Sequence, residues 1–331
     1  MGVRMMFLLY LFLLVIELVW SIDIQLNFAD DSTAQAACCS NGGAGTGPNV
    51  NCCNLRSAVA FCSQQGSSIL DTCTVQLMPS RATSISASLG QLELGVGLAN
   101  RMSVAGPGTI TSEPTRTQHS RLIYFNANLS SASLSLGNLT VAGFGSKSID
   151  GGAMWLLGEV AASLSLVTFE DNSGKDGGSI WMSENSLGMR LNRCVFLHSV
   201  ASGSGGGIFV EQDVSDVIVQ ASTFDNCTSS STVQYTGGGA IYMGMRNHGL
   251  SIMNSTFSNI IAKREGGALF FNQNNSDISV ESSTFSNSRA KYGGALAFFQ
   301  SNSNVSVESS TFTNCSAQYG GGAIEIEQSN S

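Results

Sequence analysis

The chain contains nearly the same segment twice. "SSTFSNSRAKYGGALAFFQ" spans Ser282–Gln300, and "SSTFTNCSAQYGGGAIEIE" spans Ser309–Glu327, 27 residues further along. Gly-Gly pairs recur at steps of 26 to 32 residues, beginning at Gly151, Gly177, Gly206, Gly238, Gly266, Gly293 and Gly321. A period of this length is typical of a solenoid, in which stacked copies of one unit share a continuous core.

Within each repeat the apolar residues alternate with polar ones. Ile278 and Val280 lie seven and five residues before Phe285, and short apolar runs such as "AIYM" and "ALFF" follow the Gly pairs. Alternation with period two predicts strands. A helical solenoid is disfavoured because no unit has a long stretch with helical spacing, and Ser, Thr and Gly are abundant. The predicted fold is therefore all-β, a right-handed parallel β-helix with coils of about 26–32 residues.

Stacking such coils in register places equivalent residues in columns, about 4.8 Å apart. A recurring Phe predicts an internal stack of rings, at Phe169, Phe196, Phe224, Phe257, Phe285 and Phe312. Phe144 is expected to precede them in phase, and the Ala after the Gly pair is expected to point inward. The Gly pairs are expected to supply positive φ at one corner of the coil. The stretch "TSSSTVQYT" adds residues to one unit and predicts a loop.

A polar residue stands two positions after each Phe. The members of this predicted turn column are Asp171, His198, Asn226, Asn259, Asn287 and Asn314. Asn tolerates the left-handed backbone conformation, and its amide group can bond the neighbouring coil. We therefore interpret these residues as turn residues.

The N-terminal residues indicate export. Phe7–Trp20 is a 14-residue apolar run preceded by a single Arg. A membrane-spanning helix needs about 20 apolar residues, so residues 1–21 are predicted to be a signal peptide cleaved after Ser21. We therefore expect the protein to be secreted, extracellular or at the cell surface.

Cysteines and sequons agree with this compartment. Six of nine cysteines cluster near the N-terminus and are disulfide candidates: Cys38, Cys39, Cys52, Cys53, Cys62 and Cys73. They allow 15 pairings, among which the sequence does not choose. A zinc site is the less favoured alternative, because no His lies nearby and no CxxC occurs. Seven Asn-x-Ser/Thr sequons predict glycosylation at Asn128, Asn138, Asn226, Asn254, Asn274, Asn304 and Asn314.

The cysteine cluster also contains one predicted helix, Asn54–Gly66, with Asn54 as its cap and Gly66 at its end. A solenoid needs a cap over its exposed core. The predicted organisation is thus a signal peptide (1–21), a Cys-rich N-terminal cap with a short helix (22–73) and a parallel β-helix (74–331). The sequence stops midway through a coil, so further coils, and any membrane anchor, are expected only beyond residue 331.

The order of motifs "NLRSAVAFC…TVQLMP…MSVAGPG…LIYF…LSLGNLTVAGF…GGA" resembles the start of exported β-helix proteins of the pectin-lyase-like superfamily. The units with "STFSN", "STFTNC" and "GGAI" or "GGAL" are similar to repeats of the polymorphic outer membrane proteins. The Gly-Gly-Ala element matches well, whereas the Phe-x-x-Asn element of that family is kept only by Phe169 and Asn172. The resemblance covers roughly residues 54–331. It implies the fold, and it raises the possibility of activity on acidic polysaccharides.

Charge excludes some partners. The net charge is −8 and only 11% of residues are charged. No basic stripe is available to displace counterions from a polyanion, so no nucleic-acid partner is expected.

The sequence offers no catalytic constellation. The only Asp-Asp pair, Asp30–Asp31, precedes the coils, and the Asn247–Gly249 turn has no acidic pair one coil away. Asp171 and Asp176 form the best acidic cluster, with Glu170 and Lys175 beside them, but a solvated turn is the favoured interpretation. No cofactor-binding or metal-binding residues are predicted.

The remaining histidines, glutamates, cysteines and tryptophans that could serve a site can also be explained as structural residues. His119, His198 and His248 have no Cys or Ser at useful spacing. Glu281 and Glu308 share a column and could share a cation, although an exposed pair is favoured. Cys194, Cys227 and Cys315 are interpreted as small apolar residues; the last two share a column but lie three coils apart. Trp155 and Trp181 could face outward as a sugar-stacking surface or inward as core.

The leading functional hypothesis is a non-enzymatic adhesion or recognition protein. Its partner would be a cell-surface or matrix carbohydrate or protein. The alternative is a polysaccharide lyase or glycoside hydrolase with the pectin-lyase-like fold.

Overall fold

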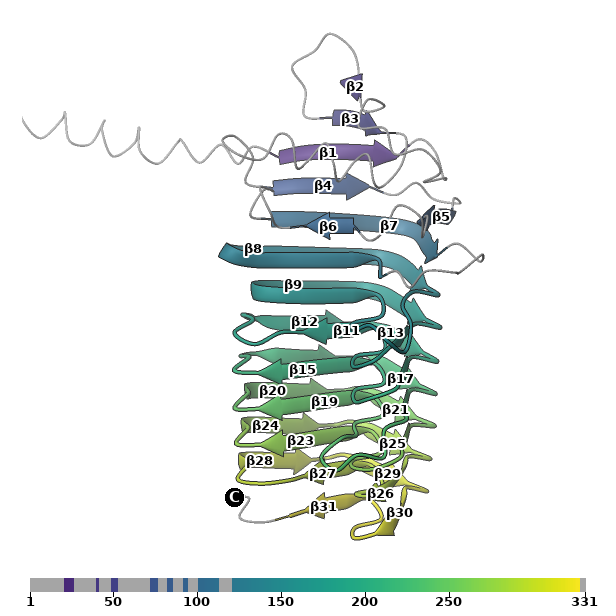
Figure 1. Ribbon diagram of the computed structural model, residues 1–331, viewed down its shortest axis with the longest axis vertical. Coiled ribbons are helices and arrows are strands. Elements are labelled where there is room, and N and C mark those ends of the chain that lie inside the picture. The colour runs from purple at the N-terminus through teal and green to yellow at the C-terminus, as the bar shows by residue number, and fades with distance from the viewer. Residues whose placement is uncertain are drawn as a thin grey trace, which may run out of the picture.

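The computed structural model describes residues 121–327 and, before them, the strands within 21–26, 40–41, 49–52, 72–76, 82–85, 92–94 and 101–112. Side chains are described for 102–112, 121–126 and 132–327. These residues form a right-handed parallel β-solenoid of about eight turns, which confirms the predicted fold class. The coils stack along the long axis of the molecule (Figure 1). No described residue is helical.

A regular coil has three strands from the main sheet and one short strand from a second sheet. One example is β11 (Ile180–Met182), β12 (Gly188–Asn192), β13 (Val195–Leu197) and β14 (Val200–Ala201). The next coils repeat this order as β15 (Ile208–Gln212), β16 (Val217–Gln220), β17 (Thr223–Asp225), β18 (Thr228–Ser229); β19 (Ile241–Met245), β20 (His248–Met253), β21 (Thr256–Ser258), β22 (Ile261–Ala262); β23 (Leu269–Gln273), β24 (Ser276–Glu281), β25 (Thr284–Ser286), β26 (Arg289–Tyr292); β27 (Leu296–Phe298), β28 (Ser303–Glu308), β29 (Thr311–Thr313), β30 (Ser316–Tyr319); and β31 (Ile324–Ile326).

The earlier coils use longer strands. β7 (Arg101–Ser112), β8 (Ile123–Ala142) and β9 (Met154–Glu170) each cover the positions of more than one later strand, and β10 (Ser173–Gly174) starts the second sheet. The remaining strands are β1 (Ser21–Leu26), β2 (Ser40–Asn41), β3 (Asn49–Cys52), β4 (Thr72–Gln76), β5 (Ala82–Ile85) and β6 (Leu92–Leu94). β1 pairs in parallel with β3 and β4, and β4 pairs with β7. Parallel pairing thus reaches into the segment predicted to be the cap.

The predicted Phe column is confirmed. Each Phe from Phe169 to Phe312 lies in register with the next. Their ring centroids are 4.5–5.0 Å apart, with interplanar angles of 3–15°. The first five rings are fully buried. Phe144 is not in phase, contrary to the prediction: Val141 pairs with Phe169, so Phe144 lies three residues past the column although it is also buried.

The turn column two residues after each Phe is also confirmed. All six members have φ between 52° and 55°. Asn287 Nδ2 donates to Asn259 Oδ1 (3.1 Å), and Asn314 Nδ2 donates to Asn287 Oδ1 (2.7 Å). The amides therefore bond one coil to the next, as expected from Asn at this position.

A second asparagine ladder is buried between the first and second strands of three successive coils. The Val214 N–H donates to Asn247 Oδ1, the Asn247 N–H to Asn275 Oδ1, and the Asn275 N–H to Asn302 Oδ1, at 2.9–3.1 Å. These three asparagines are at most 1% exposed. The side chains satisfy backbone groups that the turn leaves without a strand partner.

The glycine corner precedes the first strand of each coil. Gly151, Gly177, Gly238, Gly266 and Gly293 have φ between 52° and 65°. A Cβ on Gly177 would lie 2.1 Å from the carbonyl oxygen of Ile180, so only glycine fits. The corner glycine in the "GGG" of 205–207 is Gly205 rather than Gly206, and near the end of the chain Gly320 has positive φ rather than Gly321. The alanines that follow are buried at Ala153, Ala240, Ala268 and Ala295.

Residues 1–20 of the predicted signal peptide, the helix Asn54–Gly66 and the side chains of the six clustered cysteines lie outside the described residues, as do Asp30–Asp31, His119 and the side chain of Asn128.

Candidate functional site

Charged and aromatic groups gather on one side of the solenoid, around the glycine corner. We call this side the corner face. It comprises the residues just before each corner glycine, and the outward residues of the first strand of each coil. Backbone hydrogen bonds place the former in one column: Asp150, Asp176, Ser204, Gly237, Glu265 and Tyr292. Three of these six residues are acidic: Asp150, Asp176 and Glu265.

Asp150 and Asp176 lie in adjacent coils with a lysine between them. Lys175 Nζ is 3.7 Å from Asp150 Oδ1 and 3.6 Å from Asp176 Oδ2. Asp176 also accepts the Ser204 N–H at Oδ1 (2.7 Å), and its own N–H donates to Asp150 Oδ1 (3.3 Å). The lysine and the backbone thus hold the two carboxylates in a fixed position.

The environment makes Asp176 less acidic than an ordinary aspartate. Burial raises the pKa of its carboxyl group, the Ser204 N–H lowers it in part, and the nearby Asp150 raises it further. A carboxyl group with a raised pKa beside a second carboxyl group is an arrangement that can divide acid and base roles.

Arg121 lies against the same group of residues. Its Cζ is 4.4 Å from the ring centroid of Trp155 and 6.0 Å from that of Tyr124. Arg121 is only 7% exposed. Burial lowers its pKa to about 10, and Asp150 opposes this effect, so the guanidinium remains charged at neutral pH. Arg121 Nε and Trp155 Nε1 have no hydrogen-bond partner among the described residues.

Trp155 and Trp181 belong to an outward-facing aromatic column. Successive first strands align Tyr124, Trp155, Trp181, Phe209, Tyr242 and Phe270. Ile180 and Met182, on either side of Trp181, point into the core instead. The sequence left the facing of the two tryptophans open, and the register decides it.

Three of the six members of this column are nevertheless buried: Trp181, Tyr242 and Phe270. Trp181 is 9% exposed and Phe270 only 1%. The corner lies close to Trp181, since a Cβ on Gly151 would be 3.0 Å from the Trp181 Cβ, whereas Phe270 packs with Tyr242, Ala297 and Phe299. Tyr124, Trp155 and Phe209 remain partly exposed. The face available to a ligand is therefore the edge of the column with its charged neighbours, and not a row of free ring faces.

A second charged group lies further along the corner face. Arg264 Nε is 3.1 Å from Glu265 Oε1, and the Arg264 guanidinium lies 5.0 Å from the Tyr292 ring centroid. Lys291 Nζ lies between the Tyr292 and Tyr319 rings, at 5.7 and 5.6 Å. Burial raises the pKa of Glu265 to about 7, and Arg264 opposes it.

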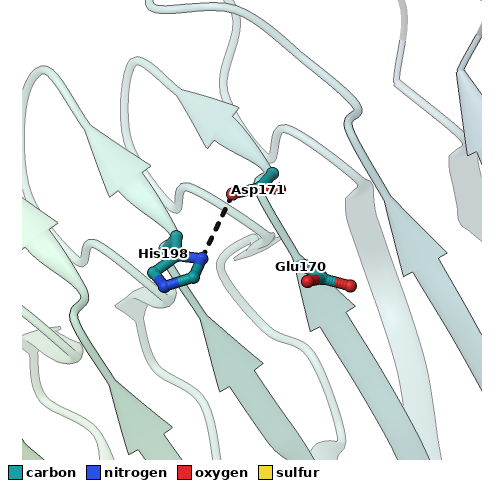
Figure 2. Close-up of side chains that lie close together, drawn as sticks. All are labelled: Glu170, Asp171 and His198. Atoms are coloured by element: carbon teal, nitrogen blue, oxygen red, sulfur yellow. Dashed lines mark ion pairs between the residues drawn. The ribbon is translucent and has the colours of Figure 1, made fainter.

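The acidic cluster noted in the sequence is only partly brought together. Glu170, Asp171 and His198 have ligand atoms within 4.8 Å of one another, and His198 Nδ1 is 3.3 Å from Asp171 Oδ1 (Figure 2). Asp171 and His198 are exposed turn residues, whereas Asp176 and Lys175 belong to the corner face. The exposed position of Asp171 agrees with the predicted solvated turn, whereas Asp176 is only partly exposed and is held by Lys175 and the Ser204 N–H.

One histidine has a partner that the sequence analysis did not find. Ser215 Oγ lies 2.9 Å from His248 Nε2 across adjacent coils, 33 residues apart, so the expectation that no His pairs with a Ser is wrong. His248 is exposed, and no carboxylate contacts it among the described residues. Without an orienting group this pair lacks the third member of a catalytic triad.

The other predicted positions fall as follows. Glu281 and Glu308 are in register and exposed. Cys194, Cys227 and Cys315 are free thiols; the first two are buried and Cys315 is partly exposed. The sequence analysis missed Arg121 and Asp150, although an acidic residue before the Gly pair at Asp150, Asp176 and Glu265 was visible as a column.

Comparison of the chain with models of protein families, with curated proteins and with solved structures finds no match. Among the described residues, no helix has the length and apolar character required to cross a membrane.

Proposed function

We propose that this chain is an exported, non-enzymatic recognition protein, secreted or at the cell surface, that binds a cell-surface or matrix carbohydrate along its corner face. The observation that carries the proposal is the convergence of Arg121, partly exposed Trp155 and the Asp150–Lys175–Asp176 cluster. Carboxylates accept hydrogen bonds from sugar hydroxyl groups, and Lys and Arg donate to sugar oxygens. Partly exposed aromatic edges supply apolar contact.

The solenoid supports a ligand that is itself a repeating chain. Adjacent coils are about 4.8 Å apart, so the corner face offers side chains at regular intervals along the axis. The Gly-Gly-Ala repeats further support a place near the pectin-lyase-like superfamily and the polymorphic outer membrane protein repeats. The net charge of −8 favours neutral over strongly acidic polysaccharides, and it disfavours nucleic acid.

Affinity electrophoresis in gels that contain neutral or acidic polysaccharides tests the proposal. Retardation of the wild-type chain is expected with at least one neutral polysaccharide. Lys175→Ala, which removes a cation that is 58% exposed, should abolish most of this retardation. Arg190→Ala is the matched control, because Arg190 is an exposed cation in β12, away from the corner face. Equal retardation of both variants, or none for the wild type, would count against the proposal.

A hydrolase or lyase is a second candidate, favoured by the raised pKa of Asp176 beside Asp150. Both Asp176 oxygens are already engaged, by Lys175 and by the Ser204 N–H, which argues for a positioning role instead. Incubation with pectins, alginates and glycosaminoglycans distinguishes the candidates. New reducing ends or unsaturated uronates that disappear in Asp176→Asn would establish an enzyme, whereas retention without cleavage supports recognition.

A further inference from the structure

The sequon asparagines occupy one kind of structural position. Six of the seven have described side chains, all six are exposed, and all have φ between 50° and 55°: Asn138, Asn226, Asn254, Asn274, Asn304 and Asn314. In four of them the Ser or Thr of the sequon begins the next strand, as Thr256 begins β21. These four acceptor asparagines therefore lie in turns, and all six are exposed, so a large polar substituent on the amide can extend into solvent.

These asparagines lie along three edges of the solenoid. Asn274 lies between the first and second strands of its coil, and Asn304 is the second residue of the second strand, β28. Asn254 lies between the second and third strands, and Asn138, within β8, has the corresponding position in its longer strand. Asn226 and Asn314 follow the third strand. The fourth edge is the glycine corner, and no sequon falls on it among the described residues.

We propose that N-linked oligosaccharides occupy these three edges and leave the corner face as the one long side that is free of glycan. That the glycan-free corner face is also the side that binds the ligand rests on the proposed function. In the modification step, Asn Nδ2 attacks the anomeric carbon of an oligosaccharide carried on a lipid pyrophosphate. A carbon–nitrogen bond forms, the carbon–oxygen bond to the pyrophosphate breaks, the lipid pyrophosphate leaves, and one amide proton passes to a base.

The folded coil is compatible with these substituents. Asn226, Asn254 and Asn274 donate no hydrogen bond from Nδ2 within the described part of the chain. Asn304 Nδ2 donates to Asp277 Oδ1 (2.6 Å), and Asn314 Nδ2 donates to the amide oxygen one coil earlier. A substituted amide keeps one N–H, so these two ladder bonds persist after modification.

The full chain, expressed with its own N-terminal segment in a glycosylating eukaryotic cell line, provides the test. Enzymatic removal of N-glycans in heavy-oxygen water marks each occupied Asn for mass spectrometry. Marked peptides are expected at all six positions. Thr256→Ala and Thr228→Ala, which leave the turn asparagines in place, should each remove one glycan. A folded product without marks at these positions would overturn the inference.

A matched variant places a glycan on the bare side. Gln234→Asn creates a sequon with Thr236, in the exposed loop between β18 and β19 at the corner. We expect this variant to gain one glycan and to lose polysaccharide retardation, whereas Thr256→Ala retains it. If the six sites are occupied and the Gln234→Asn glycan leaves retardation intact, the corner is not the ligand side. If no chain is retarded, the proposed function fails while the glycan pattern stands.

Discussion

The buried asparagine ladder makes a quantitative prediction at Asn275. Its Nδ2 donates to the Gly244 carbonyl (2.9 Å) and to Asn302 Oδ1 (3.0 Å), and its Oδ1 accepts the Asn247 N–H (3.0 Å). Asn275→Asp keeps the shape of the side chain but puts an oxygen in place of Nδ2. That oxygen faces the Gly244 carbonyl oxygen and Asn302 Oδ1, so both donated bonds are lost. Each buried polar group left without its bond costs about 1–3 kcal/mol, and burial of a carboxylate adds to this. We expect a loss of about 3–5 kcal/mol in the free energy of unfolding at pH 7.

The loss should depend on pH with a definite sign. Burial among oxygens raises the pKa of the introduced carboxyl in the folded state above its unfolded value of about 3.9. The folded state then binds more protons than the unfolded state, so stability falls as pH rises, by up to about 1.4 kcal/mol per unit. This fall continues until the folded pKa is reached. The variant is therefore expected to be closer to wild type at pH 4 than at pH 7.

Asn287→Asp is the matched control. Asn287 belongs to the exposed ladder, where its Nδ2 donates only to Asn259 Oδ1. Water can replace that bond, and Asp tolerates the φ of 53° as it does at Asp171. The expected change is within about 1 kcal/mol. Urea unfolding followed by circular dichroism measures both variants, with amide hydrogen exchange to detect local opening. Equal losses, or a loss at Asn275→Asp that does not vary with pH, would refute the assignment of this ladder as a buried structural element.

Three further predictions concern the core, the corner and pH. Phe224→Ala should cost about 3–5 kcal/mol, because Phe224 is fully buried between two stacked rings; Phe312→Ala, partly exposed with one stacked neighbour, should cost clearly less in the same urea assay. Gly177→Ala should lower the melting temperature strongly, because of its φ of 65° and the 2.1 Å clash, whereas Gly137→Ala, with a nearest contact of 3.9 Å, should be nearly silent. Since the pKa of Glu265 is raised to about 7 in the folded state, its contribution is largest at low pH and is lost as pH rises from about 4.5 to 7. Glu265→Gln should flatten the stability profile across that window, and an unchanged profile would contradict the assignment.

The two ladders show how a sequence with few charged residues stabilises a solenoid. A side chain that repeats at the coil period lies next to the same side chain in the adjacent coil, so charged side chains in such a column would repel one another along the axis. Asn and Ser avoid this because each carries both a donor and an acceptor. The serines of one turn illustrate it: the N–H groups of Cys194, Ser222, Ser255 and Ser283 donate to the hydroxyl of the serine one coil further. The low charged fraction of the chain, 11%, agrees with this requirement.

The sequence by itself determined the repeat and most of what depends on it. The Phe stack, the left-handed Asn turns, the buried alanines and the glycine corner could all be predicted, because a stacked coil must present the same residue to the coils on both sides of it. The predicted alignment was wrong where the number of residues per coil changes. Phe144 was assigned to the Phe column from its distance in the sequence, but Val141 is the residue that pairs with Phe169.

Only the tertiary structure decided contacts that cross between coils or between faces. The facing of Trp181 could not be predicted, because the corner covers the outer side of the first strand and both sides are then apolar, which removes the alternation that marks an outer face. The Ser215–His248 pair and the approach of Arg121 to Asp150 depend on which residues lie opposite one another in adjacent coils. The sequence does not say where a turn absorbs extra residues: the inserted loop lengthens one repeat, yet Phe224 still pairs with Phe257 and Phe257 with Phe285.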